Sequence, residues 1–264
     1  MSLNKGRLLS QYTAVDGLSM HAHVSVEPLP EDAPTVILVH GLVVSSRYMI
    51  PVAELLASVA RVYAPDLPGY GESDKPERVL DLPELTDVLC RWMDEVGIER
   101  ATMLGNSFGC QIIAEFTVRH PTRIERAVLQ GPTLDWHTRS LPQQVLGFIT
   151  NPQLENPSLA LVTAYDYWLA GFWRIIRTIQ IMLEDRIEEK LPHMHIPTLV
   201  VRGQKDPIVS QQWAEEVVKR LPDGQLAVVP GAGHTMNYST PQELSRVTQA
   251  FLNATKSHPV KEMT

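Results

Sequence analysis

The chain has 264 residues, a formal net charge of −7 and a hydrophobic content of 44%. This length suits one large domain, and the acidic balance without a basic stripe argues against nucleic-acid binding. No apolar run approaches the roughly 20 residues that cross a bilayer. We therefore expect a soluble cytoplasmic protein with neither nucleic acid nor a membrane as a partner.

The first part of the chain predicts strands that alternate with helices. Residues 11–14 and 20–26 flank Asp16-Gly17, a strong turn signal, and predict an antiparallel hairpin at the edge of a sheet. The run 35–39 is almost wholly apolar and predicts a strand buried on both faces. A helix is expected over 49–60, followed by the next strand over 61–64. Helical spacing of apolar residues predicts a further helix over 82–96, which Gly97 ends.

A Gly-x-Ser-x-Gly run follows the next short strand, over residues 101–104, and precedes a helical pattern over 108–120. A serine in this position lies on a sharp turn between strand and helix. Gly105 and Gly109 remove the side chains that would collide as the two elements close on each other. The turn lifts the Ser107 hydroxyl above the sheet, at the N-terminus of a helix that favours developing negative charge.

Two later loops carry the partners that a serine nucleophile needs. Strand 198–201 leads to Asp206, and strand 226–229 leads through Gly231 and Gly233 to His234. The 28 residues between the two side chains (234 minus 206) leave room for one helix, over 211–220, and one strand. A serine hydroxyl needs a base to take its proton, and the base needs a group that orients it. The order Ser107, Asp206, His234, each just past a strand, predicts this triad.

Five motifs in this order resemble the α/β-hydrolase fold family over nearly the whole chain. They are His40-Gly41 after strand 35–39, the loop from Asp66 to Ser73, the Ser107 turn, the Gly-x-x-Asp loop at Asp206 and Gly-x-Gly-His at His234. The resemblance implies a mostly parallel, doubly wound α/β sheet of about eight strands with an inserted helical cap. It also implies an oxyanion hole made by the backbone N–H groups of Leu42 and Phe108.

The alternation of strands and helices stops after strand 124–130 and resumes at residue 198. We expect the core to comprise residues 1–130 and 197–254, the helical cap 131–196 and a polar tail 255–264. Helices over 161–170 and 172–189, hinged at Gly171, would cover the active site and exclude water. The side chains predicted to contact substrate are Trp136, Tyr165, Trp168, Trp173 and Met236.

Several other polar residues have structural explanations that compete with a functional one. We expect His40 to shape its turn and Asp66 to hold loop backbone, neither taking part in chemistry. Asp135, in the loop after strand 124–130, is the competitor of Asp206 for the acid of the triad. His193 and His195 are interpreted as surface histidines, because no carboxylate pattern nearby supports a metal site.

Ser107 favours attack on a carbonyl group, and hydrolysis of a small carboxylic ester is the first hypothesis. The runner-up is a carbon–carbon bond hydrolase for ring-cleavage products of aromatic catabolism, since Gly-Asn-Ser-Phe-Gly resembles that group. That group has tryptophan after its histidine, whereas Thr235 and Met236 follow His234 here. A lactonase, a thioesterase or a non-catalytic ligand receptor also stay open. No cofactor or metal is expected, the partner is a small acyl substrate, and the oligomeric state is left open.

Overall fold

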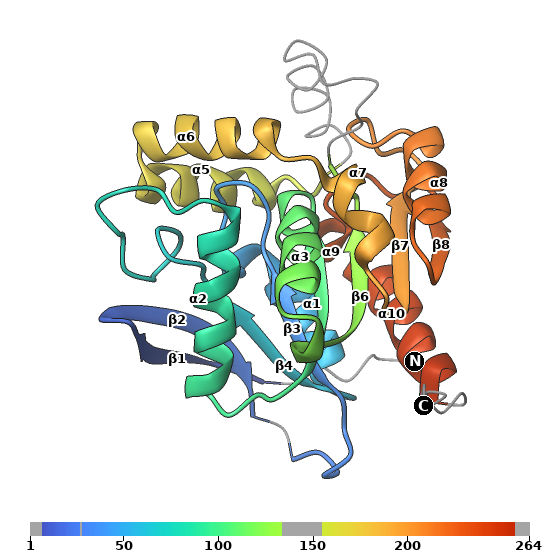
Figure 1. Ribbon diagram of the computed structural model, residues 1–264, viewed down its shortest axis with the longest axis horizontal. Coiled ribbons are helices and arrows are strands. Elements are labelled where there is room, and N and C mark those ends of the chain that lie inside the picture. Colours follow the sequence, from blue (N-terminus) through green and yellow to red (C-terminus); the bar gives the residue numbers. More distant parts are fainter. Residues whose placement is uncertain (1–6, 27, 134–154, 257–264) are drawn as a thin grey trace.

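The computed structural model describes residues 7–26, 28–133 and 155–256 (Figure 1). Eight strands form one sheet in the order β1-β2-β4-β3-β5-β6-β7-β8. Their bounds are Leu8–Val15 for β1, Leu18–Ser25 for β2, Thr35–Val39 for β3, Arg61–Pro65 for β4, Ala101–Asn106 for β5, Ile124–Gln130 for β6, Thr198–Gly203 for β7 and Gly224–Val229 for β8.

The antiparallel pairings of this sheet are the two made by β2. β1 pairs with β2 across the turn at Asp16 and Gly17, and β2 pairs antiparallel with β4. Every pairing from β4 to β8 is parallel. The expected α/β fold, with about eight mostly parallel strands and an antiparallel hairpin at the edge, is confirmed. Because parallel strands end at the same edge of a sheet, the loops after β3, β5, β7 and β8 meet there.

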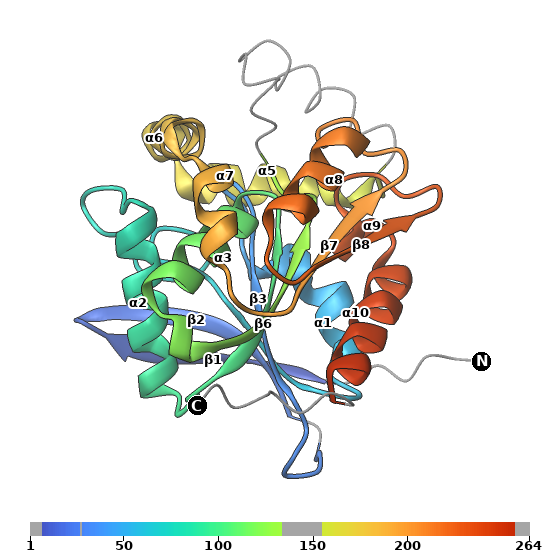
Figure 2. The same ribbon diagram turned by 45° about the vertical axis from the view of Figure 1, so that its right-hand side comes forward.

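Helices cover both faces of the sheet, as Figures 1 and 2 show. α2 and α3 pack together, and α1 packs against α10. The helix bounds are Ile50–Leu56 for α1, Leu82–Glu95 for α2, Phe108–Arg119 for α3, Gln211–Arg220 for α8, Met236–Ser239 for α9 and Pro241–Lys256 for α10.

Two apolar cores lie on the two faces, and successive residues of one strand enter different cores. Ile37 and Val39 of β3 pack into the core that contains α2 and α3, whereas Val36 and Leu38 pack into the core that contains α1 and α10. This follows from the two-residue period of a strand. It also explains why strand 35–39 is apolar at nearly every position.

The described part of the connection between β6 and β7, where the alternation stops, contains three α-helices. They are α5 over Ser158–Ala170, α6 over Phe172–Glu184 and α7 over Ile187–Lys190. Gly171 joins the first two with φ 78°, a conformation that glycine adopts without strain. Figure 1 shows α5 and α6 side by side across one end of the sheet. We call α5, α6 and α7 together the helical insertion.

Two expected helices differ from the structure. The helix expected over 49–60 is a 3-10 turn, Ser46–Met49, followed by α1, which ends at Leu56. The helix expected over 172–189 ends at Glu184, because Asp185 has an extended backbone (φ −70°, ψ 144°) that separates α6 from α7.

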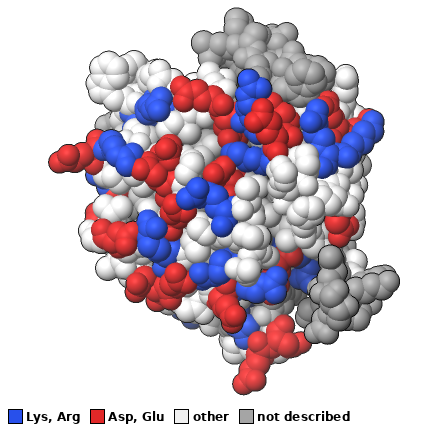
Figure 3. Space-filling view, in the orientation of Figure 1, with Lys and Arg blue, Asp and Glu red and all other residues white. Residues whose placement is uncertain are grey.

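The surface shown in Figure 3 carries both signs of charge. Lys and Arg side chains are interspersed with Asp and Glu over this face, and no broad patch of one sign stands out. Within the described ranges, none of the helices has the length and apolar character that a bilayer crossing requires.

Candidate active site

The loops after β5, β7 and β8 bring the three residues of the expected triad to one edge of the sheet. Ser107 directly follows β5, Asp206 lies three residues after Gly203, the last residue of β7, and His234 lies five residues after Val229, the last residue of β8. Ser107 and His234 line the same cavity. All three side chains are buried, with residue exposures of 4–5%.

The backbone at Ser107 is strained. Its φ of 58° and ψ of −118° lie in a region that residues with a side chain rarely adopt. A Cβ on Gly105 would lie 2.7 Å from the backbone of Gly109, and a Cβ on Gly109 would lie 2.4 Å from the carbonyl oxygen of Val39. Both glycines are therefore required by close backbone approach. Such a conformation costs on the order of 1–3 kcal/mol and is found where it positions a functional side chain.

Asp206 orients His234. His234 Nδ1 lies 2.8 Å from Asp206 Oδ2, and Asp206 Oδ1 accepts hydrogen bonds from the backbone N–H groups of Ile208 (2.8 Å) and Val209 (3.0 Å). A hydrogen bond between Nδ1 and the carboxylate leaves His234 Nε2 as the ring nitrogen available for chemistry.

The same arrangement shifts the pKa values of both partners. Burial alone would lower the pKa of His234, but the charge and hydrogen bond of Asp206, with a contribution from the Glu155 carboxylate, raise it above its ordinary value. Burial opposes ionisation of Asp206, and the attraction of His234 together with three hydrogen bonds outweighs it and lowers the Asp206 pKa. Asp206 is thus held ionised beside a histidine of increased basicity.

Two amide side chains that the motifs did not indicate hold the histidine loop. Gln130 Nε2 donates to the His234 carbonyl oxygen at 2.7 Å, and Asn106 Nδ2 donates to the same oxygen at 3.3 Å. Gly131 adopts φ 58°, and a Cβ there would lie 2.9 Å from His234 Cε1. A polar residue directly after the apolar run 127–129, as Gln130 is, is the sequence signal that could have revealed this support.

The expected oxyanion donors lie on two elements that border Ser107. Leu42 lines the cavity with Ser107, and Phe108 is the first residue of α3. The loop that carries Leu42 is held by Tyr48, whose hydroxyl accepts from the Gly41 N–H at 2.6 Å and donates to Asn106 Oδ1 at 2.9 Å. The roles of the Leu42 and Phe108 N–H groups stay predictions.

The helical insertion also holds this loop, through a buried carboxylate. Asp166 on α5 is 1% exposed, and its Oδ2 accepts from the Ser45 N–H (2.9 Å) and the Ser45 hydroxyl (2.8 Å). Its Oδ1 accepts from Arg47 Nη1 at 2.5 Å, and the Arg47 guanidinium lies 4.8 Å from the centre of the Tyr165 ring. Ser45 is three residues from Leu42, so α5 is linked to the loop of the expected oxyanion hole.

The cavity at Ser107 has a volume of about 480 Å³. One wall comes from the near face of α5, and the others come from the β3 loop and the strand ends. The lining residues are Gly41, Leu42, Val44, Tyr48, Asn106, Ser107, Glu155, Asn156, Pro157, Leu159, Ala160, Thr163, Ala164, Tyr167, Ile208, His234 and Thr235.

Four of the five side chains predicted to contact substrate do not line the described cavity, and their contact with substrate stays a prediction. Tyr165, Trp168 and Trp173 are 48%, 74% and 80% exposed and are not among the residues that line the cavity. Met236 is fully buried in the core against α1 and α10, and Trp136 lies outside the described residues.

Helical periodicity explains the difference. Positions 160, 163, 164 and 167 of α5 face the cavity, whereas positions 161, 165 and 168 lie on its exposed face. Both faces of α5 are apolar, so apolar character alone could not distinguish them. Tyr165 and Trp168 therefore lie on the face of α5 that does not line the described cavity.

Two of the competing polar residues have structural roles, as expected. His40 Nε2 accepts from the Leu67 N–H at 3.0 Å, and burial lowers the pKa of this histidine, which keeps it neutral. Asp66 accepts from the backbone N–H groups of Ser46 (2.6 Å) and Glu72 (2.9 Å). Asp135 lies outside the described residues.

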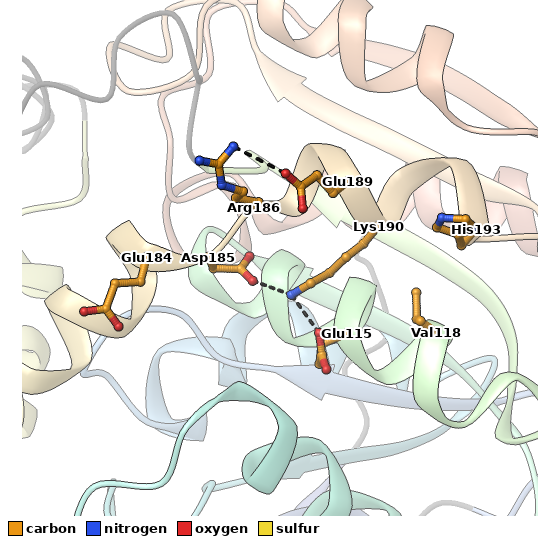
Figure 4. A pocket seen from close by; sticks show the side chains of 8 residues that line it. All are labelled: Glu115, Val118, Glu184, Asp185, Arg186, Glu189, Lys190 and His193. Carbon is orange, nitrogen blue, oxygen red and sulfur yellow. Dashed lines mark hydrogen bonds and ion pairs between the residues drawn. The ribbon is translucent and has the colours of Figure 1, made fainter.

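A second hollow, of about 460 Å³, lies between α3 and the end of the helical insertion (Figure 4). Lys190 forms ion pairs there with Glu115 on α3, at 2.7 Å, and with Asp185. These contacts fasten α7 to α3, and His193 lies at the edge of the hollow. Among the described residues, no group of three or more His, Cys, Asp or Glu side chains is arranged to hold a metal ion.

Comparisons with known proteins agree with this architecture. Carboxylesterase YbfK of Bacillus subtilis (strain 168) is 26% identical over 246 residues, which are 84% of this chain and 81% of the relative. Esterase YbfF of Escherichia coli (strain K12) is 23% identical over 239 residues, 83% of this chain and 92% of the relative. The 2-hydroxy-6-oxo-6-phenylhexa-2,4-dienoate hydrolase BphD of Rhodococcus sp. strain RHA1 has a similar fold, with a TM-score of 0.75, 21% identity and coverage of 94% of this chain and 99% of that one.

A family model described as the alpha/beta hydrolase family matches residues 36–247. The match begins in β3, spans the Ser107 turn and includes both loops that carry Asp206 and His234. By this match and by its fold, the chain belongs to the alpha/beta hydrolase family.

Proposed function

We propose that this alpha/beta hydrolase cleaves small carboxylic esters through an acyl-enzyme formed on Ser107. The observation that carries the proposal is the 2.8 Å contact between His234 Nδ1 and Asp206 Oδ2, at the cavity that the strained Ser107 also lines. Two relatives that match most of the chain are named as a carboxylesterase and an esterase, which supports the same reaction.

The proposed cycle has two halves. His234 Nε2 takes the Ser107 hydroxyl proton while the serine oxygen attacks the ester carbonyl carbon. The resulting oxyanion accepts hydrogen bonds from the N–H groups of Leu42 and Phe108, each worth roughly 3 kcal/mol of barrier. The protonated histidine then gives its proton to the alcohol that leaves. A water molecule, deprotonated by the same histidine, then attacks the acyl carbon. The bond to the Ser107 oxygen breaks, that oxygen takes the proton back from the histidine, and the acid is released. Asp206 holds the histidine tautomer throughout.

The helical insertion would supply the acyl pocket. α5 contributes Leu159, Ala160 and Tyr167 to a cavity of about 480 Å³, a volume that suits a small substrate. An apolar wall that excludes water strengthens the hydrogen bonds to the developing oxyanion.

The test is the initial rate of hydrolysis of p-nitrophenyl esters of increasing acyl length. Ser107→Ala should remove turnover, whereas Ser58→Ala should keep it, because the Ser58 hydroxyl bonds the Leu55 carbonyl on α1, away from the cavity. A burst of p-nitrophenol equal to the enzyme concentration would reveal an acyl-enzyme. Unchanged turnover in Ser107→Ala would refute the proposal.

The carbon–carbon hydrolase is the second candidate, and its test uses a vinylogous diketone acid in place of an ester. Turnover of that acid without turnover of any ester would replace the first proposal. Binding of small ligands without turnover of either would favour the receptor.

A further inference from the structure

The cavity at Ser107 contains a carboxylate that the triad does not use. Glu155 is 9% exposed and lines the cavity. Its Oε1 accepts from the Thr235 N–H at 2.7 Å, and its Oε2 accepts from the Ser239 hydroxyl. A carboxylate that accepts with both oxygens is fixed in place. Glu155 therefore carries its charge at a defined position in the wall.

No cation offsets that charge within the described part of the cavity. The two groups that donate to Glu155 are a backbone amide and a hydroxyl, and both are neutral. Lys and Arg are absent from the described lining, where Glu155 is the one carboxylate. The other lining side chains are apolar or neutral polar, apart from the titratable His234. In such surroundings a charge is weakly screened, so it acts on whatever enters the cavity.

The position of Glu155 places its charge beside the reacting groups. Thr235, whose N–H it accepts, directly follows His234, and the Glu155 charge is among those that raise the His234 pKa. Ser107 and His234 line the same cavity as Glu155. A substrate bound for attack by Ser107 would therefore bring its neighbouring groups into the field of this carboxylate.

We infer that Glu155 selects substrates by charge: the cavity takes esters whose bound part is uncharged or carries an ammonium group, and rejects those that carry a carboxylate. The inference rests on the proposed function for the identity of the site as a reaction centre. It deepens that function by naming the substrate class. It also disfavours the vinylogous diketone acids of the second candidate, because these carry a carboxylate.

Three acyl groups of similar size test the inference. They are the 4-(trimethylammonio)butanoyl group, its uncharged isostere 5,5-dimethylhexanoyl and the anionic 5-carboxypentanoyl group, each as a p-nitrophenyl ester. At about 7 Å and an effective dielectric constant of about 20, one unit charge changes a binding or rate constant by roughly 50-fold. Solvent screening reduces this, so we expect kcat/KM for the anionic ester to be at least about tenfold below that for the uncharged one.

Substitutions at Glu155 separate charge from shape. Glu155→Gln keeps an oxygen that can accept from the Thr235 N–H, and it should reduce the ratio between uncharged and anionic esters to about threefold or less. Glu155→Asp keeps the charge and should retain most of the ratio. Glu243→Gln removes the same charge from an exposed side chain on α10 that pairs with Arg246, and it should leave the ratio unchanged.

The outcomes distinguish a failure of the inference from a failure of the proposed function. The inference alone would be overturned if Ser107 is needed for turnover of the uncharged ester but kcat/KM is nearly the same for the uncharged and anionic esters. It would also be overturned if the ratio of these two kcat/KM values is unchanged in Glu155→Gln. Absence of ester turnover would overturn the proposed function, and the inference would then be decided by binding. Calorimetry with Ser107→Ala should give a weaker Kd for the propylamide of the anionic acid than for the propylamides of the other two acids. Adding Glu155→Gln to Ser107→Ala should remove this difference in Kd. Equal Kd values for the three amides would refute the inference.

Discussion

Removing the Asp166 carboxylate tests how the helical insertion is attached to the core. This side chain on α5 accepts hydrogen bonds from the Ser45 N–H, the Ser45 hydroxyl and Arg47. Burial is the largest influence on it, outweighs these partners and raises its pKa. The negative charge itself is therefore an unfavourable feature of the folded state at neutral pH, whereas the hydrogen bond to the buried Ser45 N–H is favourable.

The two contributions predict different effects for two substitutions. Asp166→Ala leaves the Ser45 N–H without its acceptor, which costs about 1–3 kcal/mol, and leaves a small void. Arg47 retains a contact with Glu72 and reaches solvent, so its loss adds little. We expect the free energy of unfolding to fall by about 2–3 kcal/mol, and Tm by roughly 5–10 °C. Asp166→Asn keeps an acceptor for Ser45 and removes the buried charge, so its cost should stay below about 1 kcal/mol.

Thermal unfolding and steady-state kinetics measure both variants. Because Ser45 is three residues from Leu42, Asp166→Ala should also lower kcat, by about tenfold, more than it changes KM. Because the pKa of Asp166 is higher in the folded protein than in the unfolded chain, protonation of Asp166 stabilises the fold at a pH below the pKa of the unfolded chain. This stabilisation is lost as the pH rises through the pKa of the folded protein. Lowering the pH from 7 towards 4 should therefore favour the wild type over Asp166→Asn. An Asn variant as unstable as the Ala variant, or an Ala variant with unchanged Tm, would refute the reasoning.

Three further predictions concern the site and its surroundings. The His234 pKa is raised, and only the neutral ring can accept a proton. We therefore expect kcat/KM to fall with decreasing pH through an apparent pKa above the ordinary value of 6.5. A fall with an apparent pKa at or below 6.5 would contradict this. Gly109→Ala would place a Cβ 2.4 Å from a carbonyl oxygen of β3. Thermal unfolding should therefore show a Tm lower by roughly 6–12 °C, or the variant should not fold. A Tm equal to that of the wild type would be inconsistent with the close approach. Trp168 is 74% exposed and outside the cavity lining, so Trp168→Ser should change KM by less than about twofold, whereas a tenfold increase would return this side chain to the substrate site.

Local sequence patterns determined the parts of this molecule that depend on neighbours along the chain. β3 and β6 have the predicted bounds. For β3 the reason is that a short, nearly continuous apolar run has few alternatives to a buried strand. The Ser107 turn was predictable because its two glycines are required by contacts within one strand–turn–helix unit and with the adjacent β3. Once the strands are parallel, residues just past their ends must meet at one edge. The contact between Asp206 and His234 was predictable for that reason.

Tertiary structure alone decided the features that depend on how separate elements pack. α5 is apolar on both sides, so its sequence alone does not indicate which side faces the cavity. The contact between Asp166 and Ser45 fixes the orientation of α5 on the core and so determines which side lines the cavity. Glu155 reaches Thr235 across 80 positions of sequence, and nothing near either residue indicates the other. The sheet and the order of the reactive residues follow from local sequence, because short-range sterics and strand direction specify them. The shape and charge of the cavity were decided by contacts between distant segments, which local patterns do not encode.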